Sequence, residues 1–148
     1  MEQTLVIIKP DAVARGLIGE VIRRFEAEGL WICALKMVAL NQREAEGFYE
    51  VHRHRPFFDS LTRFMASGPC VAMVLEGKEA IRRVRDLMGA TDPIRAAEGT
   101  LRRTFAASIE KNIVHGSDSS PSAAAEIPFF FSRLELLSIT GRGTTPSV

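Results

Sequence analysis

The sequence predicts one α/β domain with four strands in a βαββαβ core. Four short apolar runs have the length and composition of strands, and stretches with helical spacing of apolar residues lie between them. No linker and no internal repeat divides the 148 residues. A chain of this length buries roughly two-thirds of its unfolded surface on folding, so one core suffices.

The composition is that of an ordinary globular protein. Charged residues make up 25% of the chain and the net charge is +1, so no global field attracts a polyanion. No apolar stretch approaches the roughly 20 residues of a spanning helix, and the first run is too short for a signal peptide. Cys33 and Cys70 each lie in an apolar run, which indicates buried reduced thiols. We therefore expect a cytoplasmic protein with no obligate nucleic acid and no membrane partner.

The four predicted strands differ in their expected burial. Residues 4–8 and 70–75 are continuous apolar runs, which are typical of strands buried on both faces. Residues 31–40 form a second strand of mostly apolar residues. The fourth run, at residues 113–115, is short and ends at Gly116, where strand propensity falls away.

Helices are predicted between these strands and after the last one. Helical spacing covers residues 16–28, 42–51, 57–65, 78–88 and 119–131, and a short helix follows Thr100. Asn41 and Thr100 are suitable N-cap residues, and Gly29 and Gly89 are suitable helix ends. Phe57 begins the helix predicted at residues 57–65, where its ring could stack on a flat ligand. The basic segment before it, residues 52–56, is predicted to be a solvated loop.

One histidine stands where a ligand could reach it. His115 ends the fourth strand, and Ser117, Asp118 and Ser119 behind it are strong N-cap residues for the last helix. A helix start gathers unpaired N–H groups and partial positive charge, which favour a phosphate close to the histidine. Taken alone, the pattern favours a histidine in a helix-capping loop, because capping by itself explains the serines and the aspartate.

Cations and polar donors elsewhere in the chain indicate a polyphosphate ligand. These residues are Lys9 at the end of the first strand, Arg85, Thr91, Arg102 and Asn112. Their donors suit phosphate better than a neutral substrate, although Lys9 alone would read as a solvated side chain. The common glycine-rich nucleotide loops are absent, which suggests that a histidine carries the phosphate itself. Neutral imidazole is a competent nucleophile near pH 7, and Glu126 could hold its other nitrogen.

Six separated motifs together resemble the nucleoside diphosphate kinase family in its bacterial form. They are residues 112–119 (NIVHGSDS), Lys9-Pro10-Asp11, Tyr49 followed by residues 55–58 (RPFF), Ser67-Gly68-Pro69, residues 89–93 (GATDP) and residues 99–102 (GTLR). The resemblance runs from Thr4 to about Phe131. It implies a ferredoxin-like α/β (α+β) sandwich with a four-stranded antiparallel sheet and covering helices, in a domain spanning residues 1–137. Residues 138–148 would then be a flexible or subunit-contacting tail.

The resemblance also implies the reaction. His115 would become a phosphohistidine in a ping-pong cycle that moves the γ-phosphate of a nucleoside triphosphate, mainly ATP, to a nucleoside diphosphate and so maintains NTP and dNTP pools. The other catalytic positions would be Lys9, Tyr49, Ser117 and Glu126. The nucleotide-binding positions would be Lys9, Phe57, Arg85, Thr91, Arg102, Ile109 and Asn112. Mg²⁺ would be held mainly by the nucleotide phosphates, with Asp118 in contact through water.

Members of the family are oligomers built from dimers, usually tetramers or hexamers, so a homo-oligomer is expected. The chain departs from the family in three places. Glu98 stands where many relatives have proline, Pro128 lies inside the last helix, and the tail after Phe131 does not match. Because proline removes a helix hydrogen bond, a kink at Pro128 is expected to shift Glu126. The unusual tail leaves the number of subunits open.

Three rival interpretations remain. Ser117 as a hydrolase nucleophile is disfavoured, because neighbours two residues apart rarely reach serine–histidine geometry and no Gly-x-Ser-x-Gly turn is present. A non-catalytic nucleotide-binding module of ferredoxin-like fold is the main alternative. An inactive structural relative is the third, and the retention of every expected phosphate-contacting residue argues against it.

Overall fold

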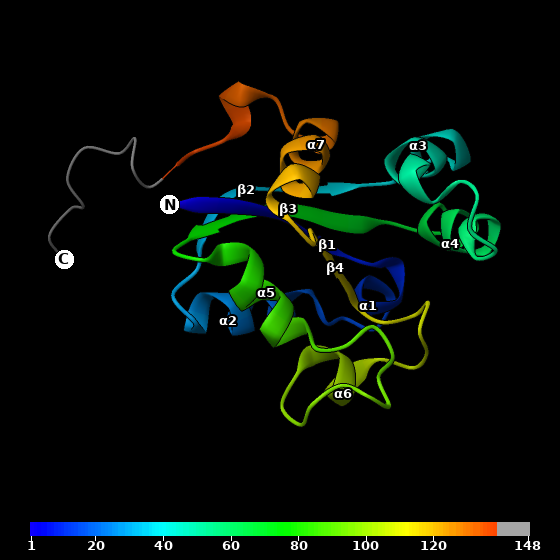
Figure 1. The fold of residues 1–148 in the computed structure, drawn as a ribbon, viewed down its shortest axis with the longest axis horizontal. Coiled ribbons are helices and arrows are strands. Elements are labelled where there is room, and N and C mark those ends of the chain that lie inside the picture. Colours follow the sequence, from blue (N-terminus) through cyan, green and yellow to red (C-terminus); the bar gives the residue numbers. More distant parts are fainter. Residues whose placement is uncertain (139–148) are drawn as a thin grey trace, which may run out of the picture.

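The computed structural model describes residues 1–138, which form one four-stranded antiparallel sheet with helices on both faces (Figure 1). The strands are β1 (Glu2–Ile8), β2 (Trp31–Val38), β3 (Cys70–Gly77) and β4 (Val114–Gly116). Their order across the sheet is β2-β3-β1-β4. β1 pairs antiparallel with both β3 and β4, and β2 pairs antiparallel with β3. The predicted sheet and the βαββαβ order are therefore confirmed.

Two helix layers cover the sheet. On one face lie α3 (Gln42–Phe48), α4 (Phe58–Met65) and α7 (Ser120–Phe130), and on the other α1 (Pro10–Ala14), α2 (Ile18–Ala27), α5 (Ala80–Met88) and α6 (Leu101–Phe105) (Figure 1). Alternation along β1 supplies both cores: Leu5 and Ile7 pack in one cluster, whereas Val6 and Ile8 pack in the other. All four side chains are completely buried, so β1 fixes the sheet between the two layers.

The predicted helix caps are present. Asn41 forms a reciprocal capping box with Glu44 at the start of α3, and the Thr100 side chain accepts a hydrogen bond from the Arg103 N–H at the start of α6. Of the three candidates before α7, Ser119 is the cap, because its Oγ accepts from the Ser122 N–H at 3.2 Å. Ser117 and Asp118 are thereby left to other contacts.

The structure contains two short elements that differ from the predictions by more than a shift of boundaries. The chain forms the additional helix α1 directly after Lys9, with Pro10 at its first position, and α2 starts only at Ile18. The predicted helix at residues 42–51 divides at Tyr49 into α3 and the 3₁₀ turn η1 (Glu50–His52). Both are one-turn features, too short for apolar periodicity to reveal.

Pro128 does not displace Glu126, contrary to the expectation. α7 continues through Pro128 to Phe130, and the Glu126 carboxylate lies 2.6 Å from the His115 ring. The exposed Pro128 has no N–H for the carbonyl one turn earlier, and that missing bond faces away from the sheet.

The chain after α7 returns to the sheet. A second 3₁₀ turn, η2 (Arg133–Glu135), leads to Leu136, which packs against the core, and to the Leu137 N–H, which donates to the Cys33 carbonyl at 2.9 Å. Residues 139–148, most of the predicted tail, lie outside the described residues. Cys33 and Cys70 are both buried, as predicted. None of the helices within residues 1–138 is long and apolar enough to cross a membrane.

Candidate functional site

A cavity of about 410 Å³ brings together residues from both helix layers and from the ends of β1 and β4. The predicted site residues that line it are Lys9, Tyr49, Phe57, Arg85, Thr91, Arg102, Ile109, Asn112, His115, Asp118 and Glu126. Ser117 is the one predicted site residue that does not line it. Positions up to 117 residues apart in the chain, Lys9 and Glu126, therefore line one cavity.

His115 projects from β4, where the backbone pairing with Ile7 of β1 holds it. Its Nε2 lies 2.6 Å from the Glu126 Oε1. Burial lowers the pKa of His115 below its ordinary value; the Glu126 carboxylate offsets part of that shift, and the cations Lys9 and Arg102 add to it. The ring is therefore neutral at pH 7. Because a neutral ring bonded to a carboxylate through Nε2 carries its proton there, Nδ1 keeps the lone pair.

Ser117 supports this pair from behind. Its Oγ donates to the Glu126 Oε1 at 3.3 Å and accepts from the Leu5 N–H at 3.2 Å. The residue is fully buried, so a substrate in the cavity does not reach the hydroxyl. This placement argues against Ser117 as a hydrolase nucleophile and fits a group that orients Glu126.

Aromatic rings wall the histidine. The rings of Phe48 and Tyr49 lie edge-on to the His115 ring, at centroid distances of 5.3 Å and 6.1 Å. Burial raises the pKa of Tyr49, and its hydroxyl has no hydrogen-bond partner within residues 1–138. A buried hydroxyl without a partner favours a ligand that supplies one.

The Lys9 ammonium is buried at the end of β1. Its Nζ donates to the Asn112 Oδ1 at 2.7 Å and to the Glu110 carbonyl at 3.5 Å. Burial, together with the nearby Arg102, lowers the pKa of Lys9 to about 8. Asn112 in turn donates through Nδ2 to the Thr91 carbonyl at 3.3 Å, so the two side chains are held as a unit.

Two arginines complete a positive wall. Arg102 donates to the carbonyls of Gly89 at 3.0 Å and Val114 at 2.8 Å, and Arg85 donates to the Gly116 carbonyl at 3.2 Å. Burial and Arg85 lower the pKa of Arg102 to about 10. Because these guanidinium bonds go to neutral carbonyls, the positive charge remains available to an anion. Arg102 Nε is buried and without a partner within residues 1–138.

The open end of the cavity is apolar. Phe57 is 46% exposed and Ile109 is 59% exposed, and both line the cavity although they come from separate segments. Large apolar side chains left in solvent at a cavity mouth are suited to a flat ring such as a nucleobase.

Sequence reasoning missed some of the lining residues. His52, expected in a solvated loop, lines the cavity with its ring 5.6 Å from the Phe57 ring and stacked at 6.5 Å on Tyr49. Glu110 also lines it, and its carboxylate accepts from the Ser60 hydroxyl at 2.7 Å. The only signal for either was proximity in sequence to Phe57 or Asn112.

The donor set does not form a metal site of its own. Within residues 1–138 no group of three or more His, Cys, Asp or Glu side chains is arranged to hold a metal ion. Asp118 lines the cavity beside Arg85, and its hydrogen bond from Ser122 at 2.5 Å lowers the pKa of its carboxyl. One ionised carboxylate fits a divalent cation that is carried mainly by the phosphates of a ligand.

Comparisons with known proteins agree with this geometry. The family model for nucleoside diphosphate kinase matches residues 2–136. The chain is 62% identical over 137 residues to the nucleoside diphosphate kinase of Desulfosudis oleivorans, covering 93% of this chain and 99% of that one. It is 59% identical over 136 residues to that of Nitrosospira multiformis, covering 92% and 96%.

Solved structures are similar over the same range. The nucleoside diphosphate kinase of Aquifex aeolicus has a TM-score of 0.90 and 48% identity, covering 92% of this chain and 99% of that one. That of Halobacterium salinarum, solved in complex with CDP, has a TM-score of 0.89 and 43% identity, covering 93% and 91%. On fold, sequence and the arrangement around its histidine, the chain belongs to the nucleoside diphosphate kinase family.

Proposed function

We propose that this chain moves the γ-phosphate of a nucleoside triphosphate, mainly ATP, to a nucleoside diphosphate through a phosphohistidine on His115. The observation that carries the proposal is the His115 ring, held through Nε2 by Glu126 and gathered with Lys9, Arg85 and Arg102 in one cavity. Membership of the family supports phosphate transfer between nucleotides over a module that only binds them. In a cell this activity maintains the NTP and dNTP pools.

The first half-reaction begins at His115 Nδ1. Its lone pair attacks the γ-phosphorus, the N–P bond forms, the bond to the bridging oxygen breaks, and the nucleoside diphosphate leaves with that electron pair. The ring gains positive charge, which the Glu126 carboxylate at Nε2 compensates. In the second half-reaction a diphosphate oxygen attacks the phosphorus and the N–P electron pair returns to Nδ1.

The cations act on the oxygens that carry the developing charge. Lys9, Arg85 and Arg102 bind the phosphates, and their charge stabilises the transferring group and the leaving oxygen. Thr91 adds a hydroxyl donor. Tyr49, with its unpartnered hydroxyl beside the ring, supplies a hydrogen bond to the phosphohistidine.

The nucleoside lies toward the apolar mouth. Its base stacks on Phe57 and contacts Ile109, and its ribose hydroxyls contact Asn112 and Lys9. Stacking reads the face of a base, which all bases share, so the site accepts purines and pyrimidines alike.

We propose Mg²⁺ as the divalent cation. When bound, it neutralises charge on the nucleotide phosphates that hold it. Asp118 is the protein group that would contact it through water, since its carboxylate lines the cavity.

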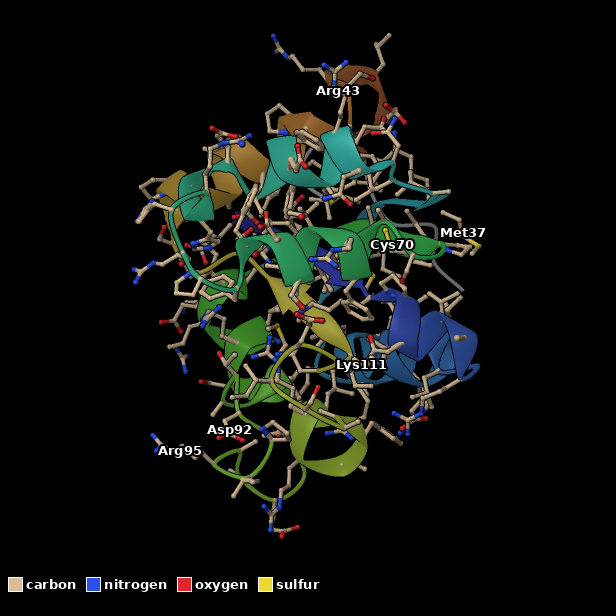
Figure 2. The ribbon with its side chains drawn as sticks, turned by 90° about the vertical axis from the view of Figure 1, so that its right-hand side faces the viewer. Met37, Arg43, Cys70, Asp92, Arg95 and Lys111 are labelled. Carbon is tan, nitrogen blue, oxygen red and sulfur yellow. The ribbon has the colours of Figure 1, made fainter. Side chains whose placement is uncertain are left out.

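We also propose a cytoplasmic homo-oligomer built from dimers, a tetramer or a hexamer. Support comes from β2, which lies at one edge of the sheet with Leu35 49% exposed and Met37 58% exposed. Figure 2 shows Met37 pointing outward at that edge. An exposed apolar sheet edge is typical of an association surface. The domain is proposed to end near residue 137.

Intact mass after incubation with ATP and Mg²⁺ tests the mechanism. One added phosphate that is lost in acid, survives base and is discharged by any nucleoside diphosphate is expected. His115→Asn abolishes the adduct, whereas His54→Asn, an exposed histidine outside the cavity, retains it. Bound nucleotide without any adduct would establish the binding module instead, and an acid-stable adduct would move the chemistry to a hydroxyl.

A further inference from the structure

Ile113, between the nucleotide-contacting Asn112 and the strand that carries His115, has an unusual backbone conformation. Its φ is +78°, in the left-handed region that branched side chains avoid. The Val114 N–H donates to the Asn112 carbonyl at 2.9 Å, which closes a three-residue γ-turn centred on Ile113. The side chain is completely buried. Strain of this kind persists only where surrounding contacts enforce it.

Both polar backbone groups of Ile113 are held by the segment that follows β1. The Lys9 N–H donates to the Ile113 carbonyl at 2.9 Å, and the Asp11 Oδ2 accepts from the Ile113 N–H at 3.1 Å. The second Asp11 oxygen, Oδ1, is buried without a hydrogen-bond partner within residues 1–138. A buried carboxylate oxygen without a partner destabilises the fold. The contact between Asp11 and Ile113 therefore joins two destabilising features, this oxygen and the positive φ of Ile113.

The turn determines how the two halves of the site face each other. Before it, Asn112 points into the cavity and accepts from Lys9 Nζ. After it, Val114 and His115 enter the sheet opposite Ile8 and Ile7. A relaxed φ at Ile113 would rotate Asn112 and its bonded ammonium away from the histidine ring.

We propose that Asp11 is a positioning residue, which holds the strained turn at Ile113 and thereby places Asn112 and Lys9 against His115. The inference rests on the proposed function, because its consequence is the rate at which His115 is phosphorylated. Asp11 touches neither the cavity nor the ring. It acts through the backbone of Ile113.

A second role for the same carboxylate is separable. The Asp11 charge lies near Lys9 and favours its ammonium form. Asp11→Asn removes that charge but keeps an oxygen that accepts from the Ile113 N–H, whereas Asp11→Ala removes both. Positioning therefore predicts that the asparagine variant phosphorylates His115 within about threefold of the wild type, and that the alanine variant loses about tenfold to a hundredfold.

The decisive experiment repeats Asp11→Ala in the Ile113→Gly background. Glycine adopts positive φ without penalty, so the Asp11 carboxylate is no longer needed to hold the turn. In the Ile113→Gly background, Asp11→Ala therefore lowers the single-turnover rate of phosphorylation by ATP and Mg²⁺ less than about threefold. The cavity that Ile113→Gly leaves is present both with and without Asp11→Ala, so it does not affect this comparison. Equal losses in the two backgrounds, or an asparagine variant as slow as the alanine variant, would overturn the proposal.

Two further measurements separate positioning from folding and from the reaction. Asp59→Ala is the matched control, since Asp59 also lies in the first turn of a helix but is exposed and outside the cavity; its rate is unchanged.

If Asp11→Ala fails to fold, the asparagine variant decides. A crystal structure of Asp11→Ala, or of Asp11→Asn in that case, reads the turn directly. Ile113 is expected to leave positive φ in the alanine variant and to keep it in the asparagine variant. A positive φ in the alanine variant, or its loss in the asparagine variant, would contradict the inference. An unphosphorylated wild type would refute the proposed function alone.

Discussion

At the scale of single residues, burial sets the charge of the two groups on which the proposed chemistry depends. Lys9 must be an ammonium to attract phosphate, yet burial lowers its pKa to about 8. His115 must be neutral to attack, and burial lowers its pKa as well. The same desolvation therefore protects the nucleophile from acid and makes the phosphate-binding cation sensitive to base.

The pH dependence of kcat/KM follows from the lowered pKa values of Lys9 and His115. As pH rises through about 8, Lys9 loses its proton and with it the attraction for the phosphates, so kcat/KM falls by about tenfold per pH unit above that value. On the acid side the loss begins only below the ordinary histidine range, because the pKa of His115 is lowered. Initial rates between about pH 5 and 10 measure both limbs. Lys9→Arg, whose guanidinium stays charged, shifts the basic limb upward; a limb that stays near pH 8 in this variant would assign it to another group.

At the scale of elements, α7 contains two prolines in unlike positions. Pro121 lies in the first turn, where helix N–H groups have no intrahelical acceptor, and its fixed φ suits the start of a helix. Pro128 lies in the interior, where it removes one hydrogen bond. Glu126 nevertheless reaches His115, so the element tolerates Pro128 at a cost in stability and without loss of the site geometry.

Pro128→Ala is expected to raise the free energy of unfolding by about 1–3 kcal/mol, because the restored N–H bonds the carbonyl one turn earlier at an exposed position. Chemical denaturation measures the change. The matched control Pro121→Ala gives no gain, since the N–H that it adds has no acceptor in the helix. kcat stays within about twofold of the wild type in both. A drop in kcat for Pro128→Ala would mean that Pro128 helps to bring Glu126 to the ring.

The helices that could be predicted from sequence are those with several turns or a strong cap. Apolar periodicity predicted α2, α4 and α5, and the N-cap residues Asn41 and Thr100 predicted the starts of α3 and α6. Both signals are contained within a few residues of the chain. α1 and η1 went unpredicted. A single turn is too short for apolar periodicity to reveal it.

At the scale of the whole molecule, the strand order leaves β2 at an edge. β3 pairs with one side of β2, and the other side has no partner strand within residues 1–138. The apolar side chains Leu35 and Met37 lie on that strand, more than 45% exposed each. An unpaired edge with exposed apolar groups is stable in solution when a second chain covers it.

Met37→Lys is accordingly expected to weaken self-association. A charge placed in an apolar interface must be buried or must separate the chains, so the dissociation constant of the dimer rises by at least about tenfold. Multi-angle light scattering over a dilution series measures it, with circular dichroism as the check on folding. An unchanged mass at every concentration would place the subunit interface elsewhere.

The class of the fold, the strand runs, the helix caps and many of the residues that line the cavity follow from the amino-acid sequence alone. Those properties depend on hydrophobic periodicity, backbone propensity and motifs such as residues 112–119, all of which are local. Three features are visible only in the folded chain: Glu126 holds His115 through Nε2, His52 reaches the cavity, and Ile113 has a positive φ. The last two depend on packing between segments distant in the chain. The first depends on the turn at residues 117–119 that places α7 against β1, and no local pattern specifies that geometry.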